Sequence, residues 1–221
     1  MIIIMLGAQG TGKGTVAGLL NEKTGWPQIS TGDIFRKNIS ENTELGIEAN
    51  KYISKGDLVP DSITVPMVAD RLNANDTVNG AILDGFPRTV EQAEALDKIL
   101  DEKGKKVDLV INLVTPREEI IERMVNRRIC SNQECKAIYN LKMHPPVKPG
   151  ICDKCGRELV QRDDDKDEKA IQKRLETYEE KTQPLVDYYK EKGVLRTETV
   201  STSINRLGKD VADDIEKDIL R

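Results

Sequence analysis

Gly7-Ala8-Gln9-Gly10-Thr11-Gly12-Lys13-Gly14-Thr15 follows the apolar run Ile2 to Leu6 directly and leads into a stretch with helical spacing. We therefore expect a short strand to end at Gly7, where glycines let the backbone turn tightly and point successive N–H groups at one anion. Lys13 adds a positive charge, and the helix that begins near it offers the positive end of its dipole. The spacing Gly-x4-Gly-Lys between a strand and a helix predicts a phosphate-binding P-loop.

One position of this loop departs from the common pattern. The lysine of a P-loop is usually followed by Ser or Thr, which ligates Mg²⁺, but here Gly14 follows Lys13 and Thr15 comes one place later. The form GxxGxGKGT resembles the adenylate kinase family, although Gln9 stands where that family commonly has proline. The resemblance implies ATP binding by Gly10, Thr11, Gly12, Lys13, Gly14 and Thr15.

Composition limits the classes of function. The 221 residues carry a net charge of −4, and 33% of them are charged while 4% are aromatic. An acidic chain is a poor general binder of polyanions, so positive charge for phosphates must be concentrated in a cleft. The first residues lack the basic and apolar regions of a secretory signal, and no stretch is apolar enough to span a membrane. We expect a cytoplasmic, reducing setting, without membrane or nucleic-acid partners and with a monomer as the default.

Segments typical of strands alternate with segments of helical spacing. Strands are predicted over residues 2–6, 28–30, 81–84, 107–114 and 195–200. Helices are predicted over residues 13–23, 34–55 (two short helices), 61–72, 90–100, 116–128, 168–192 and 207–220. The alternation predicts an α/β protein with the P-loop three-layer fold, in which about five parallel strands have helices on both faces.

Two insertions interrupt this pattern. The first, residues 30–60, is helical, and the resemblance implies that it binds a nucleoside monophosphate. The second, residues 128–165, contains prolines, glycines and all four cysteines, and the resemblance implies that it forms a lid. The remaining segments, 1–29, 61–127 and 166–221, then make up the core domain. The acidic run 163–165 at the end of the lid is typical of a turn or a solvated face, and a larger role stays open.

Two helix starts carry capping signals. Thr115 is predicted to be an N-cap, with Pro116 at the first helical position and Glu118 completing a capping box. Asp61 is predicted to cap the helix over residues 61–72.

Asp84-Gly85-Phe86-Pro87-Arg88, with Gln92 four residues on, also resembles the adenylate kinase family. Asp84 ends a predicted strand, at the edge of the sheet where doubly wound folds bind ligands. A lone aspartate there is often only a turn former. Beside a P-loop we expect it to support Mg²⁺ through bound water, because Gly14 supplies no hydroxyl, and Asp33 is a second candidate.

The resemblance implies an AMP site over both halves of the chain. Arg36 and Arg88 can form two-point contacts with the doubly charged phosphate of AMP. Gln92 carries a donor and an acceptor on one amide, as an adenine edge requires. The AMP-binding residues that the resemblance implies are Thr31, Arg36, Asp57, Leu58, Val59, Gly85, Phe86, Pro87, Arg88, Gln92, Arg162 and Arg174.

Arg123 and Arg127 lie four residues apart on the helix predicted over residues 116–128, so they would share a face. Such like charges destabilise a helix unless an anion meets them. The resemblance places Arg127 against the donor adenine and Arg123 at the phosphates, with Ile138 and Tyr139 as further ATP contacts.

Phosphoryl transfer to a phosphate oxygen needs no general base, because the acceptor is already ionised. The single histidine, His144, is therefore expected to be structural or exposed. Catalysis is then expected to depend on cations that stabilise the charge on the transferring phosphoryl group. The catalytic residues that the resemblance implies are Lys13, Asp84, Arg88, Arg123, Arg162 and Arg174.

The four cysteines form two pairs. Cys130 and Cys135 have four residues between them, Cys152 and Cys155 have two, and no cysteine lies elsewhere in the chain. Two such knuckles suit one tetrahedral Zn²⁺, and four thiolates leave no open position for catalysis. The sequence therefore predicts a structural zinc site in the lid; free buried thiols are the alternative.

The resemblance implies the reaction Mg²⁺·ATP + AMP ⇌ 2 ADP, with the two insertions closing over the nucleotides to exclude water. Three alternative functions differ in how well the sequence supports them. A nucleoside monophosphate kinase with broad triphosphate donor use stays open, because contacts to the donor base near residues 199–203 cannot be aligned. A zinc-ribbon nucleic-acid binder is a remote alternative, since few aromatic residues accompany the cysteines. A GTPase is disfavoured because no NKxD motif occurs.

Overall fold

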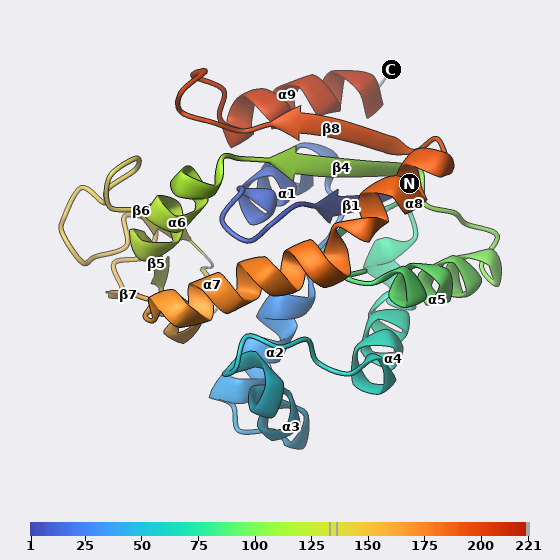
Figure 1. The fold of residues 1–221 in the computed structure, drawn as a ribbon, viewed down its shortest axis with the longest axis horizontal. Coiled ribbons are helices and arrows are strands. Elements are labelled where there is room, and N and C mark those ends of the chain that lie inside the picture. The colour runs from blue at the N-terminus through green and yellow to red at the C-terminus, as the bar shows by residue number, and fades with distance from the viewer. Residues whose placement is uncertain (133, 136, 220–221) are drawn as a thin grey trace.

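A computed structural model describes residues 1–132, 134–135 and 137–219, and its centre is a sheet of five parallel strands in the order β2-β3-β1-β4-β8 (Figure 1). The strands are β1 (Ile2–Leu6), β2 (Gln28–Ser30), β3 (Ala81–Asp84), β4 (Leu109–Val114) and β8 (Leu195–Thr199). All five residues of β1 are buried, as expected for a parallel strand that is covered on both faces. The predicted fold class is confirmed.

Alternate residues of β1 contribute to two separate cores. Ile2 and Ile4 pack with residues of α4 (Asp61–Arg71), α5 (Val90–Asp101) and α8 (Pro184–Glu191). Ile3 and Met5 pack on the opposite face with α1 (Lys13–Thr24) and α9 (Gly208–Ile219), so the chain forms three layers. The predicted end of the closing helix at residue 220 lies outside the described residues.

Two helices between β2 and α4 project from one end of the core (Figure 1). They are α2 (Thr31–Ser40) and α3 (Glu44–Ile53). Helix α2 starts three residues before its predicted position because the Ser30 hydroxyl accepts a hydrogen bond from Asp33 N at 3.3 Å and caps it. After α4 a short 3-10 turn, η1 (Asn75–Thr77), leads to β3.

Both predicted side-chain caps are wrong. Pro60 precedes α4, and the Asp61 carboxylate instead accepts a hydrogen bond from Gln92 Nε2 at 2.6 Å. Pro116 precedes α6 (Arg117–Val125), while Thr115 Oγ1 donates to the carbonyl of Val200 at 2.6 Å. In each case a residue far away in the sequence binds the polar side chain that the local spacing predicted to cap the helix.

The helix predicted to reach residue 128 ends at Val125, and the chain continues as β5 (Arg127–Cys130). Strand β5 is the centre of an antiparallel sheet with β6 (Ile138–Asn140) and β7 (Leu159–Val160). Arg123 and Arg127 therefore do not share a helical face, and that prediction is wrong. Figure 1 shows this second sheet beside α6 and α7, away from the central sheet.

The chain returns from β7 through a 3-10 turn, η2 (Asp163–Asp165), into α7 (Glu168–Thr177). The helical stretch predicted over 168–192 is present, but a π-helical turn, η3 (Tyr178–Thr182), separates α7 from α8. Figure 1 shows α7 crossing in front of the core, so that it links the second sheet to α8.

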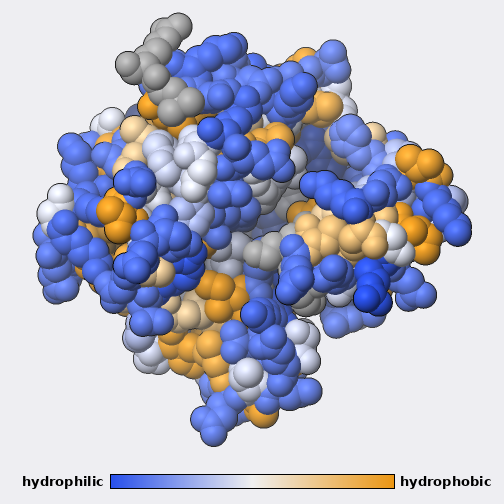
Figure 2. Space-filling view, turned by 180° about the vertical axis from the view of Figure 1, so that it is seen from behind, coloured by the Kyte–Doolittle hydropathy of each residue, from blue (hydrophilic) through white to orange (hydrophobic). Residues whose placement is uncertain are grey.

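The face shown in Figure 2 is mainly hydrophilic, with apolar side chains in separate patches. Among the residues that the structure describes, no helix has the length and apolar character required to cross a bilayer.

Candidate active site and metal centre

The P-loop lies between β1 and α1. Gly7 has φ 131°, and a Cβ there would lie 2.4 Å from the carbonyl oxygen of Leu113, so a side chain is excluded. Lys13 Nζ donates to the carbonyls of Gly7 and Ala8 at 2.7 and 2.8 Å, which places its charge over the loop. Burial in the cleft lowers the pKa of Lys13 to about 8, while the Asp84 carboxylate acts in the opposite direction.

Asp84 ends β3 at the register position of Met5 in β1. Its Oδ2 accepts a hydrogen bond from Gln28 Nε2 at 3.3 Å and would lie 3.5 Å from a Cβ built on Gly14. The carboxylate therefore lies beside the first turn of α1, next to residue 14, which has no side chain. Its oxygen donors are of the type that Mg²⁺ prefers.

Asp33, the second residue predicted to support the metal, lies in the first turn of α2 and forms an ion pair with Arg36. Burial would raise the pKa of Asp33, but Arg36 outweighs that effect and lowers it.

Most residues of the predicted AMP site line one pocket. It is bordered by α2, the segment before α4, the loop after β3 and α7. Its lining includes Thr31, Arg36, Asp57, Leu58, Val59, Gly85, Arg88, Gln92 and Arg174. Phe86 is 1% exposed and belongs to the hydrophobic core, so its side chain does not reach this pocket.

Gln92 is held on both sides of its amide. Its Oε1 accepts from the backbone N–H of Arg88 at 2.8 Å, and its Nε2 donates to Asp61 Oδ1 at 2.6 Å. These contacts fix the amide in one orientation at the pocket wall. Asp61 thus supports the predicted base-reading residue, a role that its capping signal did not suggest.

A second pocket connects the first to the P-loop. Gly7, Lys13 and Pro87 line only this pocket, whereas Arg88 and Arg174 line both. A phosphate on the P-loop and a phosphate beside Arg88 would therefore face each other across these two arginines.

Three arginines surround the exit from the second sheet. Arg127 Nε and Nη2 donate to the Asp165 carboxylate, each at 2.7 Å, and Arg174 Nη1 donates to the same carboxylate at 3.1 Å. Arg162 Nε is buried and has no partner among the described residues. Burial and the nearby charges of Arg127 and Arg36 lower the pKa of Arg162 to about 9.

Arg123 lies apart from these arginines. Its Nη2 donates to Glu119 Oε2 at 3.0 Å and to the carbonyl of Val200 at 3.3 Å. Arg127 is instead near enough to Lys13 to lower the pKa of that lysine. Arg127 therefore lies on the side of Lys13, and Arg123 lies beside the connection from β8 to α9.

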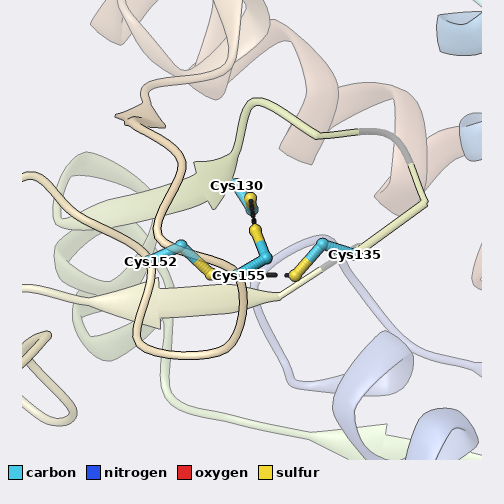
Figure 3. A group of neighbouring side chains, drawn as sticks. All are labelled: Cys130, Cys135, Cys152 and Cys155. Carbon is cyan, nitrogen blue, oxygen red and sulfur yellow. Dashed lines mark hydrogen bonds between the residues drawn. The ribbon is translucent and has the colours of Figure 1, made fainter.

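The four cysteine side chains converge beside the second sheet, one from the end of β5 and three from the connecting loops (Figure 3). Cys130 and Cys155 Sγ are 3.3 Å apart, Cys135 and Cys152 Sγ are 3.7 Å apart, and all four sulfurs lie within 4.8 Å of one another. Tetrahedral Zn–S bonds of about 2.3 Å separate the sulfurs by about 3.8 Å, so the cluster can hold such an ion.

Tyr139 was predicted as an ATP contact, but its hydroxyl lies at the cysteine cluster. It is 3.6 Å from Cys152 Sγ and accepts a hydrogen bond from Asp153 N at 2.8 Å. Burial acts to raise the pKa of Cys152, but hydrogen bonds from Tyr139 and from backbone N–H groups lower it to about 6. Its neighbour Ile138 is exposed.

The sequence signals for several of these partners were weak. Asp165 belonged to a visible acidic run, yet nothing local distinguished it from exposed Asp163. Glu119 was one of many charged residues on a helix. Only the fold brings these carboxylates to the arginines that they bind.

Comparison with known proteins agrees with this geometry. A model of the adenylate kinase family matches residues 5–194. An adenylate kinase of Caldicellulosiruptor bescii is 55% identical over 195 residues, which cover 88% of this chain and 89% of that protein. An adenylate kinase of Archaeoglobus fulgidus is 48% identical over 217 residues, which cover 98% of this chain and 99% of that protein. Both the family model and these relatives cover most of the sequence, and this chain belongs to the adenylate kinase family.

Proposed function

We propose that the protein catalyses reversible phosphoryl transfer from ATP to AMP, giving two molecules of ADP. The observation that carries the proposal is the meeting of two pockets at Arg88 and Arg174, one beside the P-loop and the other beside Arg36 and Gln92. Two bound phosphates would approach each other there, and positioning is the main requirement of such a transfer.

Different residues bind the donor phosphates, the AMP phosphate and the transferring group. The P-loop and Lys13 hold the donor phosphates, while Arg36 and Arg88 hold the AMP phosphate. Arg162 and Arg174 stabilise the charge that spreads over the transferring group. We infer from the geometry that Arg127 serves the donor phosphates and that Arg123 serves the base side of ATP.

Asp84 fits a role in metal support. We propose that its carboxylate, beside the start of α1, holds Mg²⁺ through bound water, and Asp33 remains a second candidate. The ion would neutralise negative charge on the donor phosphates. Residues 14 and 15 would then not ligate the ion, which the carboxylates would hold instead.

We further propose that the cysteine cluster holds a structural Zn²⁺. Four converging thiolates favour this ion, and they leave no free coordination position. The metal would hold β5, β6 and β7 as one body, so that residues 128–165 act as a lid over ATP while residues 30–60 close over AMP, within a core of residues 1–29, 61–127 and 166–221.

The test is a coupled assay of ADP formation with AMP, Mg²⁺ and ATP, GTP, CTP or UTP as donor. Lys13→Ala should lower kcat by about 10²–10³-fold, because it removes a preorganised charge at the transferring phosphate. Arg88→Ala should raise the KM for AMP. Lys37→Ala, at an exposed position, and Arg117→Ala, at a half-buried one, are the controls, and both positions lie outside the two pockets.

The donor series separates the two kinases that the sequence left open. Strong turnover with ATP alone indicates a base-selective adenylate kinase, whereas similar rates with all four donors indicate recognition through phosphates and stacking. If no donor supports AMP phosphorylation, the proposed reaction is wrong.

A further inference from the structure

Two segments lie beside the P-loop and the first turns of α1. They are α6 and the connection between β8 and α9. A Cβ on Gly10 would lie 3.1 Å from Met124 Cγ, so α6 packs directly on the loop. A Cβ on Gly208 would lie 3.3 Å from Val16 Cγ2, so the start of α9, into which the connection from β8 leads, packs on the first turns of α1. Figure 1 shows this connection and α6 on the same side of the molecule. The helix α6 and this connection are therefore two walls beside the P-loop and the first turns of α1.

Glu119 joins the two walls. Its Oε1 accepts a hydrogen bond from Ser201 Oγ, and its Oε2 accepts from Thr202 N at 3.1 Å and from Arg123 Nη2 at 3.0 Å. The side chains of Glu119 and Arg123 are only 17% and 11% exposed. One carboxylate thus holds a residue of its own helix and a turn that lies about 80 residues further along the chain.

The turn that Glu119 holds is already compact. Ser201 N donates to the carbonyl of Arg206 at 2.9 Å, Arg206 N donates to that of Ser201 at 3.0 Å, and Ser201 is 1% exposed. Anchoring Ser201 and Thr202 therefore positions the whole turn from 201 to 206 against Arg123.

A carboxylate near a triphosphate site would by itself repel the ligand. An exposed pair of Glu and Arg four residues apart on a helix also contributes only a few tenths of a kcal/mol. The hydrogen bonds to Ser201 and Thr202 connect Glu119 to a second segment of the chain, which the ion pair with Arg123 on the same helix does not do. They also help to lower the pKa of Glu119 against the effect of burial, so that the carboxylate stays ionised.

We propose that Glu119 is a positioning residue for the donor nucleotide, holding Arg123 and the turn 201–206 in the relative arrangement that receives the base and ribose of ATP. It acts through these groups and does not touch the reacting phosphates. The proposal rests on the proposed function, since it assigns ATP to the P-loop.

The test compares Glu119→Leu, Glu119→Gln and Ser201→Ala with Glu118→Gln, whose parent residue is exposed one position earlier on the same helix. Binding of ATP is measured by calorimetry without AMP, and steady-state constants are measured for both substrates. Glu119→Leu should weaken ATP binding about tenfold, because the two walls lose their fixed geometry. Its kcat at saturating ATP and its KM for AMP should stay near the wild-type values.

The variants that keep part of the anchor should be intermediate. Glu119→Gln retains an acceptor for Thr202 N, and Ser201→Ala retains the ion pair with Arg123, so each should weaken ATP binding less than Glu119→Leu. Combining Ser201→Ala with Glu119→Leu should add nothing further, since Ser201 acts through the carboxylate. The control Glu118→Gln should bind ATP like the wild type.

Two results would overturn this inference while leaving the proposed function intact. One is equal ATP affinity in the Glu119→Leu and Glu118→Gln variants. The other is a parallel decline of kcat and of the affinities for both AMP and ATP in Glu119→Gln and Ser201→Ala, which would show a purely structural role. A wild-type protein that neither binds ATP nor phosphorylates AMP would overturn both proposals.

Discussion

Arg127 and Asp165 form a two-point ion pair in which Nε and Nη2 of the arginine donate to separate carboxylate oxygens, each at 2.7 Å. The Asp165 side chain has no exposed surface, and Arg174 donates to the same carboxylate at 3.1 Å. The strand that enters the second sheet and the turn that leaves it are therefore tied to α7 at one buried charge.

Asp165→Asn should lower the free energy of unfolding by about 3 kcal/mol, because it leaves two partly buried arginines without their carboxylate. Asp163→Asn is the matched control: the Asp163 side chain is 97% exposed and pairs with Lys166 at the surface, so its loss should change stability by less than about 0.5 kcal/mol. Denaturant unfolding followed by circular dichroism measures both variants. Equal stabilities would show that the buried pair contributes no more than a surface pair.

Purified protein should contain one Zn²⁺ per chain, and Cys155→Ser should lose the metal and melt at a lower temperature, because the site couples metal binding to folding. His144→Ala, at an exposed position outside the cysteine cluster, should keep both properties. Elemental analysis and thermal melting provide the measurements. A native protein without zinc, in which four thiols react freely, would contradict the proposed metal site.

ATP binding should weaken as the pH rises through about 8. The pKa of Lys13 in the free protein is about 8, so the ammonium is charged below this pH and neutral above it, whereas bound phosphates favour the charged form. Above pH 8 the affinity should fall by up to about tenfold per pH unit, because binding then requires uptake of a proton. Calorimetry from pH 7 to pH 9.5 tests this, and Lys13→Met should bind ATP weakly and without this dependence. A wild-type affinity that stays level would show that Lys13 does not titrate in this range.

Tyr189→Phe should stabilise the protein by about 1 kcal/mol. The Tyr189 ring is fully buried, and its hydroxyl has no partner among the described residues, so removing the oxygen relieves an uncompensated polar group. The neighbouring Tyr188 donates to Asp97 Oδ2 at 2.7 Å, so Tyr188→Phe should instead cost about 1 kcal/mol. Changes in unfolding free energy of opposite sign for the two variants would support this assignment, and a destabilised Tyr189→Phe variant would contradict it.

The central sheet and the P-loop were predictable from the sequence because their signals are local. The apolar runs, the helical spacing and the glycines around Lys13 lie within short windows, and every predicted strand of the central sheet is present. The cysteine spacing likewise predicted a cluster that the structure brings together. The resemblance also predicted most residues of the pocket around Arg36, Arg88 and Gln92.

Local signals failed where a distant group competed for a side chain. Thr115 and Asp61 looked like helix caps, but a carbonyl of Val200 and the amide of Gln92 take their polar atoms. Arg127 looked helical, but antiparallel pairing with β6 draws it into β5.

The sequence by itself thus determined the fold class, the phosphate-binding loop, the cysteine cluster and the family. Only the tertiary structure decided which charge meets which: Asp165 with Arg127, Glu119 with Arg123 and the turn after β8, and Tyr139 with Cys152. The reason is physical, since glycine turns and apolar periodicity act through neighbouring residues, whereas a buried polar side chain takes whichever partner the folded chain brings within hydrogen-bonding distance.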